Sequence, residues 1–134
     1  MKAAYITELG PPEHIRVGDL PTPEVGASDV LVRAQALAVN YVDTLIRAGR
    51  YRTPTPFPFV VGRDLVGVVA AIGDAVDGFR IGDAVWSNSL GHDGRQGSFA
   101  EYVVVSQDRL YPLPDGADPV ETVAVLNEAS TAYL

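Results

Sequence analysis

Few side chains in this sequence have a type and spacing that could hold a metal or attack a substrate. The chain contains no cysteine, so it can form neither a thiolate metal site nor a cysteine nucleophile. Its two histidines, His14 and His92, lie far apart without ligand-like spacing. A lone histidine is more often a surface or hydrogen-bonded residue than a metal ligand. The sequence therefore predicts no metal site.

The glycines are not arranged to bind a nucleotide phosphate. No G-x-G-x-x-G stands between a strand and a helix, and the segment GRDLVG (62–67) lacks the Lys-Ser/Thr of a phosphate loop. The local basic cluster consists of Arg47, Arg50 and Arg52. We expect solvated arginines there, with a minor role near an anionic cofactor as the alternative. Cofactor binding by these residues alone is therefore at best partial.

The segment YRTPTPFPF (51–59) has prolines at alternate positions and cannot be helical. Its aromatic residues make it suited either to a wall for a flat ligand or to a rigid surface loop.

Composition and charge exclude several classes of protein. With 134 residues, 47% hydrophobic and 20% charged, the chain has the size and composition of one globular domain. A net charge of -7 disfavours nucleic acid and anionic membranes as partners. No apolar stretch approaches the roughly 20 residues of a membrane span, and the N-terminus lacks a secretory signal pattern. We therefore expect a cytoplasmic protein.

Short strands with little helix between them predict a mainly β fold, built as a small barrel or sandwich. Asp29–Asn40 is the longest predicted strand, and its alternation puts small apolar side chains from Val30 to Ala38 on one face. The other predicted strands are Lys2–Ile6, a short one around Ile15–Val17, and those near Asp64–Ile72, Asp83–Trp86 and Phe99–Val105.

Two helices have recognisable starts. Asn40 can cap a short helix over Tyr41–Ala48, with Asp43 in its first turn. Asp118 is an acidic N-cap followed by proline at the first helical position, so a second helix begins there and runs toward Leu134. This helix has no stop signal, and we expect the chain to be a piece of a longer protein.

Four segments together carry a family resemblance. They are LAVNYVDTLIRAGRY, PFVVGRDLVGVVAAIGDAVDGFRIGDAVW, GSFAEYVVV and STAYL, in this order. They resemble the medium-chain dehydrogenase/reductases over nearly the whole chain. In zinc alcohol dehydrogenases of that superfamily a cysteine stands at the position of Asn40, and a His-Glu pair at Arg63 and Asp64. Because these ligands and the four-cysteine structural lobe are missing, the chain is most similar to the zinc-free branch of quinone oxidoreductases, zeta-crystallin-like proteins and enoyl reductase domains.

The resemblance implies a GroES-like, partly open β-barrel with short helices and a C-terminal linking helix. Residues 1–117 would form this substrate-side domain, and residues 118–134 would begin the helix that leads to a Rossmann domain outside the sequence. In the full-length protein that domain would bind NADPH. We expect the chain alone to bind no cofactor tightly and to have no turnover.

The resemblance also implies reduction of a quinone or an enone by hydride transfer. Asn40 would be an amide donor in the cleft, although a helix cap needs no such role. Tyr41 would be an aromatic wall or proton donor, with a core position as its alternative, and Tyr51 would donate to the developing oxyanion. Asn40, Asn127 and Thr131 would lie beside the cofactor.

Two further expectations concern charged residues. Asp43 would hold the first helical turn through its carboxylate. Arg63 would lie near the former metal position, as an electrostatic donor or, preferably, paired with Asp64 or another acid.

Three alternatives stay open. The first is a non-catalytic GroES-like binding or assembly module such as a co-chaperonin, which would not need the NYVDTLIRAGRY and STAYL segments. The second is a fragment of a zinc-dependent alcohol dehydrogenase, which the missing ligands make improbable. The third is a stand-alone ligand-binding domain. An unpaired barrel edge also predicts a homodimer.

Overall fold

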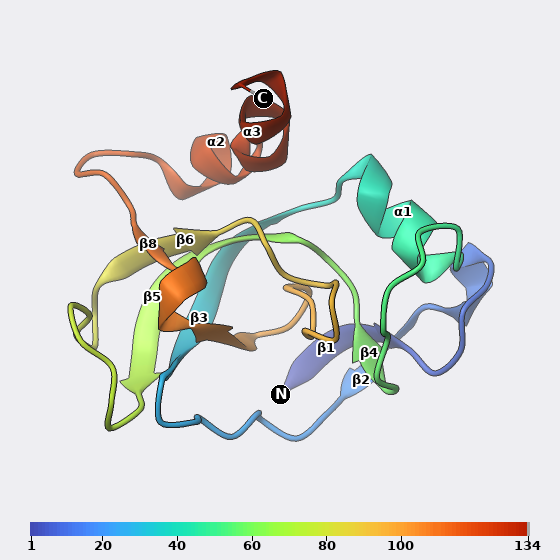
Figure 1. Cartoon of the computed structure of the whole chain (residues 1–134), viewed down its shortest axis with the longest axis horizontal. Coiled ribbons are helices and arrows are strands. Elements are labelled where there is room, and N and C mark those ends of the chain that lie inside the picture. Colours follow the sequence, from blue (N-terminus) through green and yellow to red (C-terminus); the bar gives the residue numbers. More distant parts are fainter. Residues whose placement is uncertain (134) are drawn as a thin grey trace.

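The computed structural model describes residues 1–133 and contains two antiparallel sheets (Figure 1). The smaller sheet has the strand order β2-β1-β4, and the larger has the order β7-β3-β5-β6-β8. The strands are β1 (Lys2–Ile6), β2 (Arg16–Asp19), β3 (Asp29–Ala38), β4 (Phe59–Val60), β5 (Asp64–Ile72), β6 (Ala84–Ser87), β7 (Tyr102–Ser106) and β8 (Tyr111–Pro112). The predicted mainly β, partly open architecture is confirmed, since the sheets formed by residues 1–133 do not close into a barrel.

The helices are short. They are α1 (Tyr41–Arg47), α2 (Pro119–Val123), α3 (Leu126–Tyr133) and the 3-10 turns η1 (Pro12–His14) and η2 (Gln107–Arg109). In Figure 1, α1 follows the end of β3, and α2 and α3 lie together over the larger sheet. None of the helices within residues 1–133 is long and apolar enough to cross a membrane.

The pairing of β3 with β5 is the longest in the structure and changes the expected use of β3. The register runs from Val30 opposite Ile72 to Ala38 opposite Asp64, with a shift between Ala34 and Ala36. Such a bulge moves the following residues to the other face of the sheet. The sequence predicted one apolar face along the whole strand, and the structure shows two faces in succession.

The bulge divides the core in two. Before it, Val30 and Val32 pack in the interior with Leu65 and Val69. After it, Ala36 packs on the opposite face, where it joins Val66 of β5 and the side chains of the C-terminal helices, Val123 and Leu126. Trp86 of β6 borders this second cluster and stacks on Tyr111 of β8 with ring centroids 4.6 Å apart. The bulge therefore gives the C-terminal helices an apolar surface to dock on.

Most predicted elements are confirmed, with changes at their ends. Strands β1 and β5 have the predicted bounds, β3 ends at Ala38 instead of Asn40, and β2 is displaced to Arg16–Asp19. The predicted C-terminal helix is wrong in one respect, because it is broken between α2 and α3 at Ala124 and Val125. Leu134, its predicted end, lies outside the described residues. The two-residue strands β4 and β8 were not predicted, since pairs so short carry no periodicity.

Gly67 allows β5 to approach β3 at the bulge, where a Cβ would collide with the backbone carbonyl oxygen of Arg33 and with Val32. We expect Gly67→Ala to lower the free energy of unfolding by about 1–3 kcal/mol, the usual cost of overpacking. Gly18→Ala is the matched control, because its Cβ would meet only the Tyr5 ring and hydroxyl at ordinary contact distances of 3.6 Å and beyond. Urea unfolding of both variants measures the difference, and equal stabilities would contradict the close approach.

Candidate functional site

A buried polar cluster forms where β3 ends and β5 begins. Ala38 is opposite Asp64 in the register, so the turn into α1 brings Asn40 against the start of β5. The Asn40 backbone N–H donates to Asp43 Oδ2 at 2.8 Å, and its side-chain Nδ2 donates to Asp64 Oδ2 at 2.9 Å. Asn40 is only 3% exposed. Its orientation is therefore set by two acids on different elements.

The Asp43 contact confirms the predicted capping role of this carboxylate at the first turn of α1. Asp43 is itself buried, and burial raises its pKa to about 6, with a smaller opposing effect of the hydrogen bond from Asn40. The charge of Asp64 also raises the pKa of Asp43, and the charge of Arg63 lowers it.

Asp64 is fully buried, with none of its surface exposed. Burial raises the pKa of this carboxyl as well, against the lowering effects of the Asn40 side chain and the backbone amide of Asn127. Its Oδ1 has no hydrogen-bond partner within residues 1–133. Asp64 thus connects the end of β3, the start of β5 and the beginning of α3.

The predicted pairing of Arg63 with Asp64 is wrong. Within residues 1–133 Arg63 makes no ion pair, and its Nε makes no hydrogen bond. The reason lies in the neighbouring contact, because the Asp64 carboxylate accepts from the Asn40 amide instead. The guanidinium group still lowers the pKa of both buried acids through its charge.

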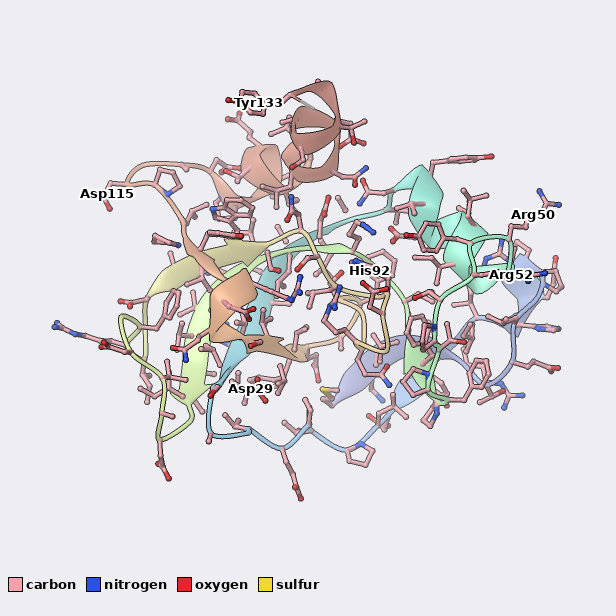
Figure 2. All side chains as sticks on the ribbon, in the orientation of Figure 1. Asp29, Arg50, Arg52, His92, Asp115 and Tyr133 are labelled. Atoms are coloured by element: carbon pink, nitrogen blue, oxygen red, sulfur yellow. The ribbon has the colours of Figure 1, made fainter. Side chains whose placement is uncertain are left out.

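His92 is held as a neutral ring on the loop after β6. Arg95 Nη2, which can only donate, contacts Nε2 at 2.9 Å, so this nitrogen accepts and the proton lies on Nδ1. Nδ1 then donates to the Leu90 carbonyl at 3.1 Å. Burial is the main reason that the pKa of His92 is lowered. In the view of Figure 2, His92 lies near the centre of the molecule, below the C-terminal helices.

The predicted site residues divide into two groups. Asn40 and Asn127 meet around the Asp64 carboxylate. Tyr41 is 77% exposed and Tyr51 42% exposed, so the alternative of a core position for Tyr41 is wrong. Thr131 is also exposed, and its hydroxyl donates to the Asn127 carbonyl within α3. Figure 2 shows Tyr133 at the outer end of this helix, and Arg50 and Arg52 beside α1.

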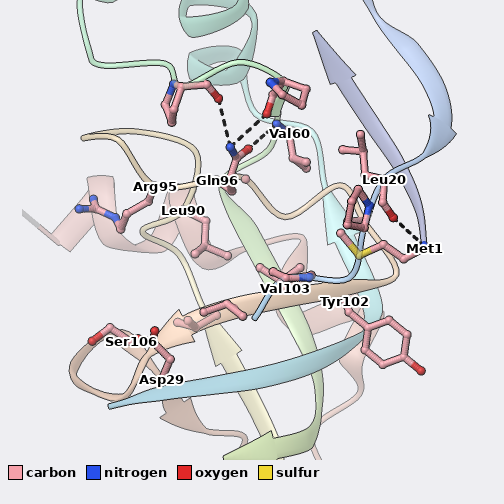
Figure 3. Close-up of a pocket in the computed structure, with 18 of the residues that line it drawn as sticks. Met1, Leu20, Asp29, Val60, Leu90, Arg95, Gln96, Tyr102, Val103 and Ser106 are labelled. Carbon is pink, nitrogen blue, oxygen red and sulfur yellow. Dashed lines mark hydrogen bonds between the residues drawn. The ribbon is translucent and has the colours of Figure 1, made fainter. Parts of the chain in front are cut away.

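A separate cavity of about 530 Å3 opens along β7, and the predicted catalytic and cofactor-binding residues do not line it. Its walls are mostly apolar and come from β7 and from loops far apart in the sequence (Figure 3). Gln96 fixes one wall, since its Nε2 donates to the carbonyls of Pro56 and Pro58 and its Oε1 accepts from the Val60 N–H. Pro56–Pro58, part of the predicted aromatic wall, therefore border this cavity. No local sequence signal identifies the cavity itself.

Burial of Asp43 predicts a pH-dependent stability. Unfolded Asp43 ionises near pH 4, whereas the folded group ionises only near 6, so this group makes the free energy of unfolding fall as the pH rises between these values. The slope is at most about 1.4 kcal/mol per pH unit for one proton. We expect Asp43→Asn to flatten the profile in this window. Asp115→Asn, at an exposed position, is the control. Urea unfolding between pH 4 and 6 measures the free energy of unfolding of both variants. If Asp43→Asn kept the wild-type dependence on pH, the assignment to Asp43 would be contradicted.

Comparison with known proteins agrees with this fold. Residues 26–115 match the family described as the alcohol dehydrogenase GroES-like domain. The chain is 34% identical to a quinone oxidoreductase of Lama guanicoe over 134 residues, which are 99% of this chain and 39% of that protein. The chain thus spans about two fifths of the length of this relative.

Solved structures give the same result. A quinone oxidoreductase of Pseudomonas syringae has a TM-score of 0.83 at 32% identity, covering 93% of this chain and 37% of the other. A mycobacterial protein in complex with NADPH has a TM-score of 0.84 at 32% identity, covering 99% of this chain and 40% of the other. From the family match over most of its length, this chain belongs to the alcohol dehydrogenase GroES-like domain family.

Proposed function

We propose that this chain is the N-terminal, substrate-side part of an NAD(P)H-dependent oxidoreductase that reduces quinones or enones by hydride transfer without zinc. The relatives named above are quinone oxidoreductases, and one similar structure contains NADPH. The observation that carries the proposal is the Asn40–Asp64 hydrogen bond at 2.9 Å. It uses the two former ligand positions as an amide–carboxylate pair, which does not fit zinc, because neither thiolate nor imidazole is present there.

Conjugated acceptors suit such a site. When a quinone or enone accepts a hydride, the negative charge spreads over a delocalised enolate, so hydrogen-bond donors can replace a metal. Asp64 takes one of the two amide hydrogens of Asn40 and leaves the other for a substrate oxygen. Tyr41 and Tyr51 are exposed, and we assign them the roles of aromatic wall and phenol donor. Bound NAD(P)H would supply the hydride.

The division of the chain follows from the same proposal. Residues 1–117 form the substrate-side domain, and residues 118–134 begin the connection to a nucleotide-binding domain. Asn127 and Thr131 on α3 lie on the cofactor side of this connection. The packing of Val123 and Leu126 on β3 and β5 supports a fixed position for this helix pair against the sheet.

Titration with 2-methyl-1,4-naphthoquinone tests the substrate side. We expect changes of backbone amide NMR shifts around Asn40, Tyr41 and Tyr51, because the quinone ring would lie against these residues. Shifts confined to β7 and Gln96 would instead assign the ligand to the cavity and contradict the proposed site. The Tyr41→Ala and Tyr51→Ala variants should weaken binding, whereas Tyr133→Ala, at a more exposed tyrosine on α3, should not.

The chain alone should not turn over. Calorimetric titration with NADPH should give no tight binding, and NADPH oxidation in the presence of the quinone should stay at the uncatalysed rate. NADPH-dependent quinone reduction by the purified chain would contradict the division into a substrate side and a separate nucleotide-binding domain.

We also propose a homodimer through the outer edge of β7. This strand is the outermost of its sheet and pairs only with β3. Ala34 N–H donates to the Glu101 carbonyl, so these two residues form a hydrogen-bonded pair between β3 and β7. In an antiparallel pair of strands, hydrogen-bonded and non-hydrogen-bonded residue pairs alternate. Val104, opposite Leu31, belongs to a non-hydrogen-bonded pair, so its backbone N–H and C=O point away from β3. Exposed edges of this kind pair with other strands.

Val104→Lys should therefore shift the chain toward monomer, since a lysine on an edge strand opposes pairing. Val120→Lys adds the same charge at an exposed position of α2 and should leave the distribution unchanged. Sedimentation velocity over a range of concentrations measures both. A wild-type chain that stays monomeric throughout would refute the dimer.

A further inference from the structure

Arg63 is fixed in its backbone and left free at its side chain. Its carbonyl accepts from the Leu90 N–H at 3.3 Å, which ties it to the loop after β6. Gly62 before it has a φ of 106°, and Asp64 after it begins β5. The residue is thus held at the junction of β5, the Leu90 loop and the end of β3.

The guanidinium group has donors without acceptors. Within residues 1–133, Nε is buried without a hydrogen bond, and the group forms no ion pair. A buried donor without a partner is costly, so such a group calls for a specific explanation. In a site that meets a substrate, the explanation is an acceptor on the ligand.

Asp43, Asp64 and His92 each accept a hydrogen bond from another donor, while Asp64 Oδ1 has no partner within residues 1–133. Asp64 Oδ2 accepts from Asn40 Nδ2, Asp43 Oδ2 accepts from the Asn40 N–H, and His92 Nε2 accepts from Arg95. The charge of Arg63 nevertheless affects the pKa of all three groups, lowering each one. The guanidinium therefore lies within electrostatic reach of α1, β5 and the His92 loop without being neutralised by any of them.

We propose that Arg63 binds the oxygen on which negative charge develops when a quinone or enone accepts a hydride. This rests on the proposed function. The hydride adds its electron pair to the conjugated system, the carbonyl π pair moves onto oxygen, and the oxyanion then takes a proton from water. NAD(P)H is the reductant and becomes NAD(P)+. Arg63 remains protonated throughout, so it stabilises charge and does not supply the proton.

Two naphthoquinones distinguish this oxyanion site from general quinone binding. The hydroxyl of 2-hydroxy-1,4-naphthoquinone is ionised at neutral pH, whereas 2-methyl-1,4-naphthoquinone is neutral. We expect the wild-type chain to bind the anion about tenfold more tightly, the effect of one charge-assisted hydrogen bond. The Arg63 Nε NMR signal should shift with the anion only.

Arg63→Gln should abolish the preference for the anion while still binding the neutral quinone. Arg63→Lys should keep part of it, because the charge remains without the planar fork. Arg50→Gln and Arg52→Gln remove the same charge from exposed positions beside α1 and should retain the preference. An unchanged amide spectrum away from β5 verifies that each variant is folded.

The outcomes separate the two proposals. Equal binding of both naphthoquinones by the wild-type chain, or a preference that persists in Arg63→Gln, overturns the role of Arg63 and leaves quinone binding intact. If neither compound shifts any signal around Asn40, the proposed function fails, and the oxyanion site fails with it. The wild-type comparison decides the question even if Arg63→Gln does not fold.

Discussion

Because β3 and β5 pair over nearly their whole lengths, residues that are more than twenty positions apart meet at one end of the larger sheet. The register that sets Ala38 opposite Asp64 also brings the turn at Asn40 onto the start of β5. The same two strands are central in the larger sheet, and β7 and β6 pair on either side of them. A slip of one residue would exchange the faces of a strand and separate Asn40 from Asp64. The site is therefore a direct consequence of strand register.

The cost of burying two carboxyl groups shapes this end of the molecule. Burial raises the pKa of both Asp43 and Asp64, and each accepts a hydrogen bond from Asn40. One asparagine thus donates a hydrogen bond to each acid, one from its backbone and one from its side chain. This double use explains why Arg63 is not needed as a counter-ion and remains available for other contacts. The two buried acids are thus held by hydrogen bonds from Asn40, and Arg63 forms no ion pair with either of them within residues 1–133.

Much of the fold follows from local sequence signals. Alternation, glycine and proline positions and helix caps predicted β1, β5, the helix after Asn40 and the helix start at Asp118. The bulge in β3 was not predictable, because Ala34 and Ala36 look equivalent in a strict alternation. It depends on how closely Gly67 of the partner strand can approach. The break between α2 and α3 likewise has no proline or glycine to announce it.

The sequence identified the residues of the candidate site but not the contacts between them. Asn40, Arg63 and Asp64 were identified through family resemblance, but the expected ion pair did not form, because an amide competes for the same carboxylate. This competition depends on how the end of β3, the start of α1 and the start of β5 are placed in space, which the sequence alone does not give. The cavity along β7 has the same origin, since its lining comes from separate loops joined by the side chain of Gln96.

Trp86 is an intrinsic fluorescence probe for the docking of α2 and α3 on the larger sheet. It is the single tryptophan of the chain, it stacks on Tyr111 at the edge of the larger sheet, and it borders the apolar cluster under α2 and α3. Indole emission depends on the polarity around the ring. Detachment of the C-terminal helices would admit water to one side of that ring while the sheet stays intact. The fluorescence of the unlabelled chain therefore reports the docking of the segment that carries Asn127 and Thr131.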